Sequence, residues 1–156
     1  GDVYDDLPKA RMALVLRLES LVRAPGVQLQ DAVSLEHVLP QTPPDGSDWI
    51  KWFPDEDERD GWTHRLANLV PLDRNKNSSA SNYDFAKKKD AYFRGKGTAS
   101  PFVLTQEVRS ESEWTPTLLT ARQKRLVNVL STHWNLEIAA DNSLPAAAVT
   151  AGGLTS

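Results

Sequence analysis

The sequence predicts an α+β fold in which two short strands and one helix are embedded in a mostly helical domain. Two apolar runs of strand length, each containing or ending at a proline, lie at residues 33–40 and 66–72. Leucines at helical spacing precede the first run, and a second set closes the patterned part of the chain. We therefore expect a small ββα unit at about residues 33–95, with flanking helices at about 7–24 and 116–134.

The first flanking helix has a recognisable beginning and end. Asp6 is a suitable N-cap, Pro8 suits the first turn, and the pair Pro25-Gly26 stops the helix. The apolar face is expected to hold Leu14, Leu18, Leu21 and Val22.

The stretch SLEHVLPQ then predicts a short strand that Pro40 and the turn-rich TPPDGSD stop. Residues 45–60 follow with seven acidic and two basic side chains, and aromatic residues are interleaved with these charges. We expect a partly helical excursion that its aromatic side chains hold to the core. These side chains are Trp49, Trp52, Phe53 and Trp62.

LANLVPL predicts the second strand, and the Asn- and Ser-rich loop after it leads into a helix over YDFAKKKDAYF. Asn82 is a plausible cap for this helix, which is expected to end at Gly95. Phe85 and Tyr92 would share one face, with the lysines opposite. Residues 74–96 carry seven basic and two acidic side chains.

The end of the chain predicts a strand at PFVLTQEV and then a helix that opens at Thr115-Pro116. One side of this helix is expected to hold Leu119, Leu126, Leu130 and Trp134. Residues 137–156 are alanine-rich and unpatterned, and we expect them to form a poorly ordered tail.

Composition bounds the class of protein. A chain of 156 residues suits one globular domain, and the lack of cysteine excludes disulfides and thiolate zinc sites. No apolar run approaches the roughly 20 residues that a membrane helix needs. The start of the sequence has no signal-peptide pattern, so a cytoplasmic location is expected, and an opening Gly without Met suggests a piece of a longer protein.

A net charge of −3 argues against nucleic acid as a partner, yet the basic stretch at 74–96 can form a local phosphate-binding patch or simply a solvated helix face.

Glu36 and His37 lie side by side at the end of the first predicted strand. A carboxylate is a hard oxygen ligand that suits magnesium or manganese, and a neutral imidazole is a natural base for activating water. Neighbouring strand residues point to opposite faces, so both can serve one site only where the strand twists or ends, as Pro40 predicts. For an isolated pair of this kind, a structural histidine beside a solvated glutamate is the commoner explanation.

Two asparagines further along the chain complete a pattern. Asn68 lies in LANLVPL, and Asn77 follows nine residues later at the turn into the next helix. In this order the sequence resembles the HNH, or ββα-metal, endonucleases. More narrowly, EHVLPQ, HRLANLVPLDRNKN and SNYDFAKKKDAYF resemble the C-terminal nuclease domain of GmrSD-type modification-dependent restriction enzymes over about residues 8–136. One departure from that pattern is Ala67, where Gly is usual.

The resemblance implies a role for each matching residue. His37 would be the general base that takes a proton from the attacking water, and Asn68 would keep the imidazole oriented. Glu36 and Asn77 would hold one divalent metal, Mg²⁺ or Mn²⁺, which neutralises charge on the phosphate and on the departing 3′ oxygen.

Weaker candidates surround this set. For His64, a contact with metal or phosphate and a structural role are equally expected, and for Asn82 the alternatives are a place beside the metal and a role as helix cap. The candidate contacts to DNA phosphates are Arg74, Lys76, Lys87, Lys88 and Lys89.

The resemblance thus implies a metal-dependent endonuclease that nicks double-stranded DNA, as the nuclease end of a modification-dependent system that restricts phage or foreign DNA. It also implies an N-terminal NTPase or sensor domain outside this sequence. One alternative is a stand-alone secreted nuclease of the same family. Another is a non-catalytic DNA-binding or interaction domain, whose mark would be loss of the acidic residue, the histidine or the metal asparagine. All three are present, which favours an enzyme.

Overall fold

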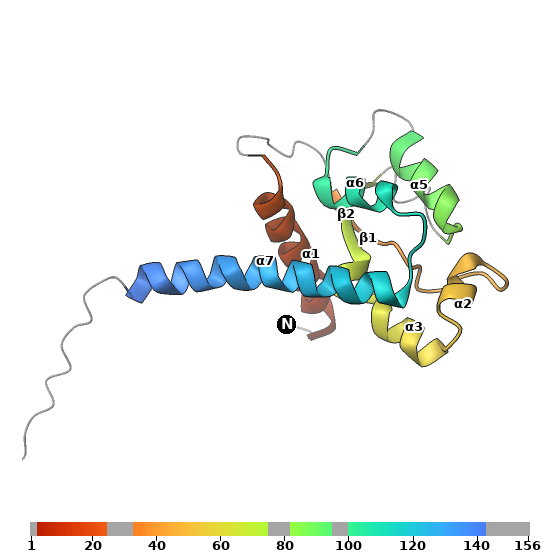
Figure 1. The fold of residues 1–156 in the computed structure, drawn as a ribbon, viewed down its shortest axis with the longest axis horizontal. Coiled ribbons are helices and arrows are strands. Elements are labelled where there is room, and N and C mark those ends of the chain that lie inside the picture. The colour runs from red at the N-terminus through yellow and green to blue at the C-terminus, as the bar shows by residue number, and fades with distance from the viewer. Residues whose placement is uncertain (1–2, 25–32, 75–81, 95–99, 143–156) are drawn as a thin grey trace, which may run out of the picture.

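A computed structural model describes residues 3–24, 33–74, 82–94 and 100–142, and it confirms the predicted α+β class. A two-stranded antiparallel sheet lies among helices (Figure 1). The elements follow in the order α1 (Val3–Val22), β1 (Val33–His37), α2 (Asp48–Trp52), α3 (Glu56–Thr63), the 3-10 turn η1 (Leu66–Asn68), β2 (Leu69–Asp73), α5 (Phe85–Arg94), α6 (Val103–Ser110) and α7 (Pro116–Asn142).

The sheet is formed by two strands in the predicted regions, but β1 ends at His37, and residues 66–68 of the predicted second strand form the turn η1, so β2 begins only at Leu69. The register sets His37, the last residue of β1, opposite Leu69, the first residue of β2. The pairing continues one residue further, because the backbone N–H of Val38 donates to the carbonyl of Asn68 at 3.0 Å. The end of β1 therefore lies directly beside the turn that precedes β2.

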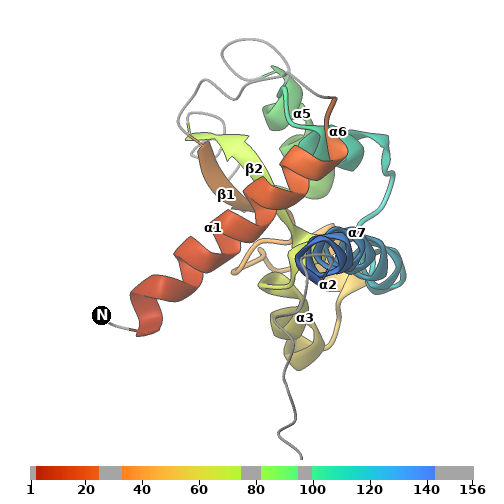
Figure 2. The ribbon, with the colours of Figure 1, turned by 90° about the vertical axis from the view of Figure 1, so that its left-hand side faces the viewer.

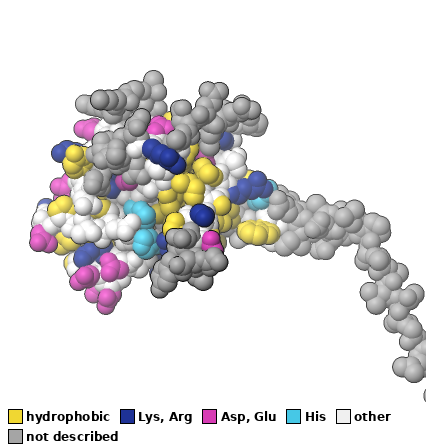
Figure 3. Space-filling view, turned by 180° about the vertical axis from the view of Figure 1, so that it is seen from behind, with side chains coloured by type: hydrophobic (Ala, Val, Ile, Leu, Met, Phe, Trp, Pro, Cys, Tyr) yellow, Lys and Arg dark blue, Asp and Glu magenta, His cyan; other side chains and the backbone are white. Residues whose placement is uncertain are grey.

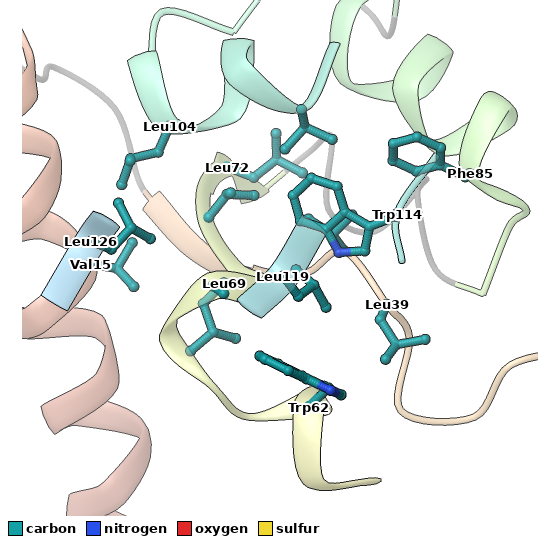
Figure 4. Close-up of a cluster of buried hydrophobic side chains, with 14 of the residues drawn as sticks. Val15, Leu39, Trp62, Leu69, Leu72, Phe85, Leu104, Trp114, Leu119 and Leu126 are labelled. Atoms are coloured by element: carbon teal, nitrogen blue, oxygen red, sulfur yellow. The ribbon is translucent and has the colours of Figure 1, made fainter. Parts of the chain in front are cut away.

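Helices pack around this sheet and complete the core. α1 and α6 contact β2, and α7 contacts both η1 and α1. Figure 2 shows α1 crossing the sheet obliquely with α7 nearly end-on beside it. Figure 4 shows part of this core, with Val15 of α1 beside Leu126 of α7 and, further along the cluster, Leu119 of α7 near Trp114. Burial of this apolar surface is the main favourable contribution to folding. The largest fully buried aromatic side chains are Trp49, Trp114, Tyr92, Phe53, Phe85 and Phe102.

The acidic segment folds as predicted, into the helices α2 and α3 held by aromatic side chains. Trp49 and Phe53 are fully buried, and the Trp49 ring meets the ring of Phe85 edge-on at 5.6 Å between centroids. Asp55 caps α3, because its side chain accepts a hydrogen bond from the backbone N–H of Glu58 at 2.7 Å. The acidic side chains themselves lie at the surface.

The predicted strand at PFVLTQEV is wrong, because these residues lie in and just before the helix α6. The reason is a contact distant in sequence. The buried carboxylate of Glu19, on α1, accepts from the backbone N–H groups of Val103 at 2.7 Å and Leu104 at 3.0 Å. These are two of the N–H groups that a helix start leaves without an internal partner, so Glu19 stabilises a helix that the local sequence does not specify.

The first helix differs from its prediction at both its start and its face. It begins at Val3, so Pro8 lies inside it and Asp6 is not its cap. Leu14 is 39% exposed, whereas Val15 is fully buried. The buried face runs through Val15, Leu18 and the partly buried Val22, which recur at helical spacing, and Leu14 lies beside it.

The helix α5 begins at Phe85, so the residue next to its first turn is Asp84 and not Asn82. The side chain of Asp84 accepts from the backbone N–H of Asp48, the first residue of α2, at 3.0 Å. The predicted cap at Asn82 is therefore wrong.

The last helix is longer than predicted. α7 continues to Asn142, so residues 137–142 of the predicted tail are helical, whereas 143–156 lie outside the described residues. Leu119 and Leu126 are fully buried as expected, but Trp134 is 58% exposed. Among the helices that the structure describes, α7 included, none is both long and apolar enough to cross a membrane.

Candidate active site

Glu36 lies at the centre of a buried polar cluster. Its side chain extends from β1 and is only 5% exposed. Two groups from α5 hold the same carboxylate oxygen, Oε1: the ammonium of Lys88 at 2.6 Å and the hydroxyl of Tyr92 at 2.8 Å. Within the described part of the chain, no hydrogen bond to Oε2 is found.

Lys88 also binds the backbone at the end of β1. Its ammonium donates to the carbonyl of His37 at 2.7 Å, and its side chain is 1% exposed. The prediction that all three lysines lie opposite Phe85 and Tyr92 is therefore wrong for Lys88, and a buried ammonium is not available for the predicted contact with DNA. The sequence does indicate that Lys88 lies on the buried side, because positions 85, 88 and 92 share one face of a helix.

Burial acts on the protonation of all three groups. It raises the pKa of the Glu36 carboxyl, and the neighbouring Lys88 ammonium and Tyr92 hydroxyl oppose this rise. It lowers the pKa of Lys88, and Glu36 opposes that change. Burial and the charge of Glu36 both raise the pKa of the Tyr92 hydroxyl well above its usual value, so this hydroxyl remains a donor. The short Lys88–Glu36 contact is a charge-assisted hydrogen bond of the strong kind.

His37 lies half-buried beside this cluster and contacts a second histidine. Its Nε2 is 3.1 Å from Nδ1 of His64, the residue that follows α3, and the two rings are nearly perpendicular. The pKa of His37 falls to about 4, mainly because of burial and in smaller part because of the positive charges of His64, Lys88 and Arg11. At neutral pH the imidazole is therefore in its basic form. Figure 3 shows histidine side chains together at the surface of this face.

Asn68 is fully buried behind the histidines and uses both ends of its side-chain amide. Its oxygen accepts from the backbone N–H of Leu39 at 2.7 Å and from the indole N–H of Trp114 at 3.0 Å. Its nitrogen donates to the carbonyls of Leu39 at 3.0 Å and Thr63 at 2.9 Å. One side chain thus ties the segment after His37 to the residue before His64.

The turn that carries Asn68 is held in place by α7. The backbone N–H of Ala67 donates to the side-chain oxygen of Gln123 at 2.7 Å, and the carbonyl of Ala67 accepts from Nε of Arg122 at 3.0 Å. Among the described residues, only Gly46 has a positive φ, so Ala67 needs no special backbone conformation here. The alanine at this position is therefore compatible with the turn.

A pocket of about 210 Å³ opens beside these side chains, and both Glu36 and His37 line it. Both residues at the end of β1 therefore line one cavity. Gln41, Asn82 and Lys88 also line the pocket.

The oxygen donors at this pocket fit a magnesium or manganese ion. Such ions take hard oxygen ligands, and Mg²⁺ is often held by only one or two carboxylates while it keeps several waters. Glu36 supplies one buried carboxylate, and Asn82 and Gln41, whose side chains are amides, are among the residues that line the pocket. Among the described residues, no group of three or more histidine, cysteine, aspartate or glutamate side chains is arranged to hold a metal ion. Asn77, the second predicted ligand, lies outside the described residues.

The predicted DNA contacts fall in different places. Arg74, at the end of β2, and Lys87 are exposed, and the Lys87 ammonium lies 3.9 Å from the centroid of the Tyr83 ring. Lys89 is partly buried and donates to the carbonyl of Glu111 at 2.7 Å. Lys76 lies outside the described residues.

Sequence comparison places this arrangement in a known family. The family model of the GmrSD restriction endonucleases, C-terminal domain, matches residues 2–129, which is most of the chain. No curated protein and no solved structure gave a match. The match confirms the predicted resemblance to GmrSD-type enzymes and supports a nuclease role in restriction. This chain belongs to the family of C-terminal domains of the GmrSD restriction endonucleases.

Proposed function

We propose that this domain is a metal-dependent DNA endonuclease of the HNH type, and that its active site is the pocket beside Glu36 and His37. The observation that carries the proposal is the end of β1, where Glu36, with its buried carboxylate, and His37, whose lowered pKa leaves the imidazole neutral, line one cavity. Family membership supports the general activity. The strand pair followed by α5 supports the more specific HNH reading, because it has the ββα order.

In this proposal His37 removes the proton from the attacking water. A hydrogen bond between its Nε2 and Nδ1 of His64 requires one of the two nitrogens to carry hydrogen. When His37 carries it, Nδ1 of His37 holds the free lone pair and is the basic nitrogen. His64 then fixes the tautomer and orientation of His37, which is a defined role for a residue whose function the sequence left open.

Asn68 acts indirectly, by holding the backbone on both sides of the histidine pair. Leu39 follows His37 by two residues, and Thr63 immediately precedes His64. By holding the backbone at these two positions, the amide of Asn68 restricts the positions of both histidines. Asn68 is thus a positioning residue.

Glu36 and Asn77 are the proposed ligands of one Mg²⁺ or Mn²⁺ ion. When bound, the ion supplies Lewis-acid charge stabilisation at the scissile phosphate and at the leaving oxygen. Glu36 contributes one buried carboxylate whose orientation Lys88 and Tyr92 fix. The amide of Asn77 is proposed from the sequence pattern alone.

Double-stranded DNA is the proposed substrate, and exposed basic side chains are its proposed contacts. Arg74 and Lys87 are exposed and available for phosphate, and Lys76 is proposed from the sequence. One active site in one chain implies a nick as the elementary product. In the cell, we propose that the domain acts in the cytoplasm with an N-terminal NTPase or sensor domain and restricts phage or other foreign DNA.

Conversion of supercoiled plasmid to the open-circular form tests this function. The purified chain is expected to nick the plasmid in Mg²⁺ or Mn²⁺ and to lose this activity in EDTA. Asn77→Ala should lower the nicking rate at least about tenfold, because a metal ligand is removed, whereas Asn128→Ala, on the exposed side of α7, should leave it unchanged. Nicking that persists in EDTA, or an Asn77→Ala variant as active as the parent, would contradict the metal-dependent site.

A further inference from the structure

We propose that Lys88 is an internal counter-ion of the active site, which holds the Glu36 carboxylate through one oxygen and lowers its affinity for the divalent ion. This inference rests on the proposed function of Glu36 as a metal ligand. It assigns a role that differs from the DNA contact expected of this lysine.

The first support is the cost of burying this pair. A lysine that is 1% exposed has left water almost completely, and so has its partner carboxylate. Such pairs commonly contribute no more to stability than well-packed apolar residues of similar volume. A purely structural lysine at position 88 would therefore be a poor solution for packing α5 against β1.

The second support is the geometry of the three hydrogen bonds. Lys88 joins the carboxylate of Glu36 to the carbonyl of His37, so one ammonium fixes the two neighbouring residues of the proposed site. Tyr92 binds the same oxygen of Glu36. Both donors thus converge on Oε1, and neither of them uses Oε2, the other oxygen of the carboxylate.

The third support concerns charge. A neutral donor to a metal-bound carboxylate fixes its orientation, and loss of such a donor usually weakens metal binding or activity. A cationic donor also repels the metal ion, because two positive charges then share one carboxylate. Removal of Lys88 should therefore tighten metal binding, and this sign separates a counter-ion from an ordinary structural residue.

Isothermal titration of the metal-free protein with MnCl₂ tests the proposal. Lys88→Met, an unbranched side chain of similar length without the charge, is expected to bind Mn²⁺ at least about tenfold more tightly than the parent. The same variant should nick plasmid at least about tenfold more slowly, because the carboxylate loses its fixed orientation. Without metal its Tm should fall by about 10 °C, since Glu36 is left buried without its partner, and Mn²⁺ should restore much of this loss.

Two matched variants serve as controls. One tests whether loss of a hydrogen bond alone tightens metal binding, and the other tests whether loss of any positive charge on α5 does. Tyr92→Phe removes a neutral donor to the same oxygen, and it should not bind Mn²⁺ more tightly than the parent. Lys87→Met removes the adjacent, exposed charge from the same helix, and its affinity for Mn²⁺ should stay within about twofold of the parent value because water screens that charge. Only the buried lysine should give tighter binding.

The outcomes distinguish this proposal from the function on which it rests. If Glu36→Gln binds Mn²⁺ as well as the parent, Glu36 is not a ligand and both proposals fail. If Glu36→Gln loses binding but a folded Lys88→Met binds no more tightly than the parent, only the counter-ion proposal is overturned. Lys88→Gln, an uncharged donor, replaces Lys88→Met should the latter not fold. If neither variant folds even in saturating Mn²⁺, Lys88 is a structural residue and the proposal is likewise overturned.

Discussion

His37→Ala is expected to lower the nicking rate by about 10² to 10⁴, which is the range that a positioned general base contributes. The variant should still fold. His37 is half-buried at the end of a strand, and the backbone contacts that hold this strand end come from Asn68 and Lys88 and not from the imidazole. The rate is best measured under single-turnover conditions, so that product release does not mask the chemical step.

His133→Ala is the matched control for this experiment. His133 lies on α7, away from β1, and its ring contacts Arg17 on α1. Its loss should leave the nicking rate within about twofold of the parent value. A His37→Ala variant that keeps more than about a tenth of the parent rate, with an unchanged circular dichroism spectrum, would assign the base to another residue, and His64 would be the first to test.

Asn68→Ala is expected to lower the free energy of unfolding by about 3–5 kcal/mol, the largest loss of stability that we expect from one polar side chain here. Asn68 is fully buried and takes part in four hydrogen bonds. Alanine removes all of them and leaves the partners on Leu39, Thr63 and Trp114 buried without compensation. Urea unfolding followed by tryptophan fluorescence measures the effect.

The isosteric variant Asn68→Asp separates hydrogen bonding from packing. It keeps the shape of the side chain but replaces two N–H donors with an oxygen that faces the carbonyls of Leu39 and Thr63. It should therefore lose at least as much stability as Asn68→Ala at neutral pH, although no cavity is formed. Asn128→Ala, on an exposed position, should change stability by less than about 0.5 kcal/mol. Equal stability of Asn68→Asp and the parent would contradict the assigned network.

The elements that the sequence predicted correctly are those specified by nearby residues. Both strands are short apolar runs, with Pro40 shortly after β1 and Pro71 in the middle of β2, and α7 begins at the predicted proline. By contrast, α6 was wrongly predicted as a strand. Its first turn is stabilised by Glu19, which lies more than eighty residues earlier in the sequence. No local pattern carries that contact.

The same distinction applies to the site. The resemblance identified Glu36, His37 and Asn68, and the structure places the first two at one pocket with Asn68 behind them. It could not show that Lys88 pairs with Glu36, because a run of three lysines looks like a solvated face until the helix is packed against β1. The spacing of Phe85, Lys88 and Tyr92 indicates that Lys88 shares the buried face of the helix. The prediction nevertheless placed Lys88 on the exposed face because its side chain is charged.

The most direct test of the central claim is a crystal of this domain soaked in MnCl₂, measured at the manganese absorption edge. The account predicts one strong anomalous peak in the pocket beside His37, within about 2.5 Å of Oε2 of Glu36. An anomalous peak elsewhere, or none in crystals of protein that nicks DNA in Mn²⁺, would contradict the assignment of this pocket as the metal-dependent active site.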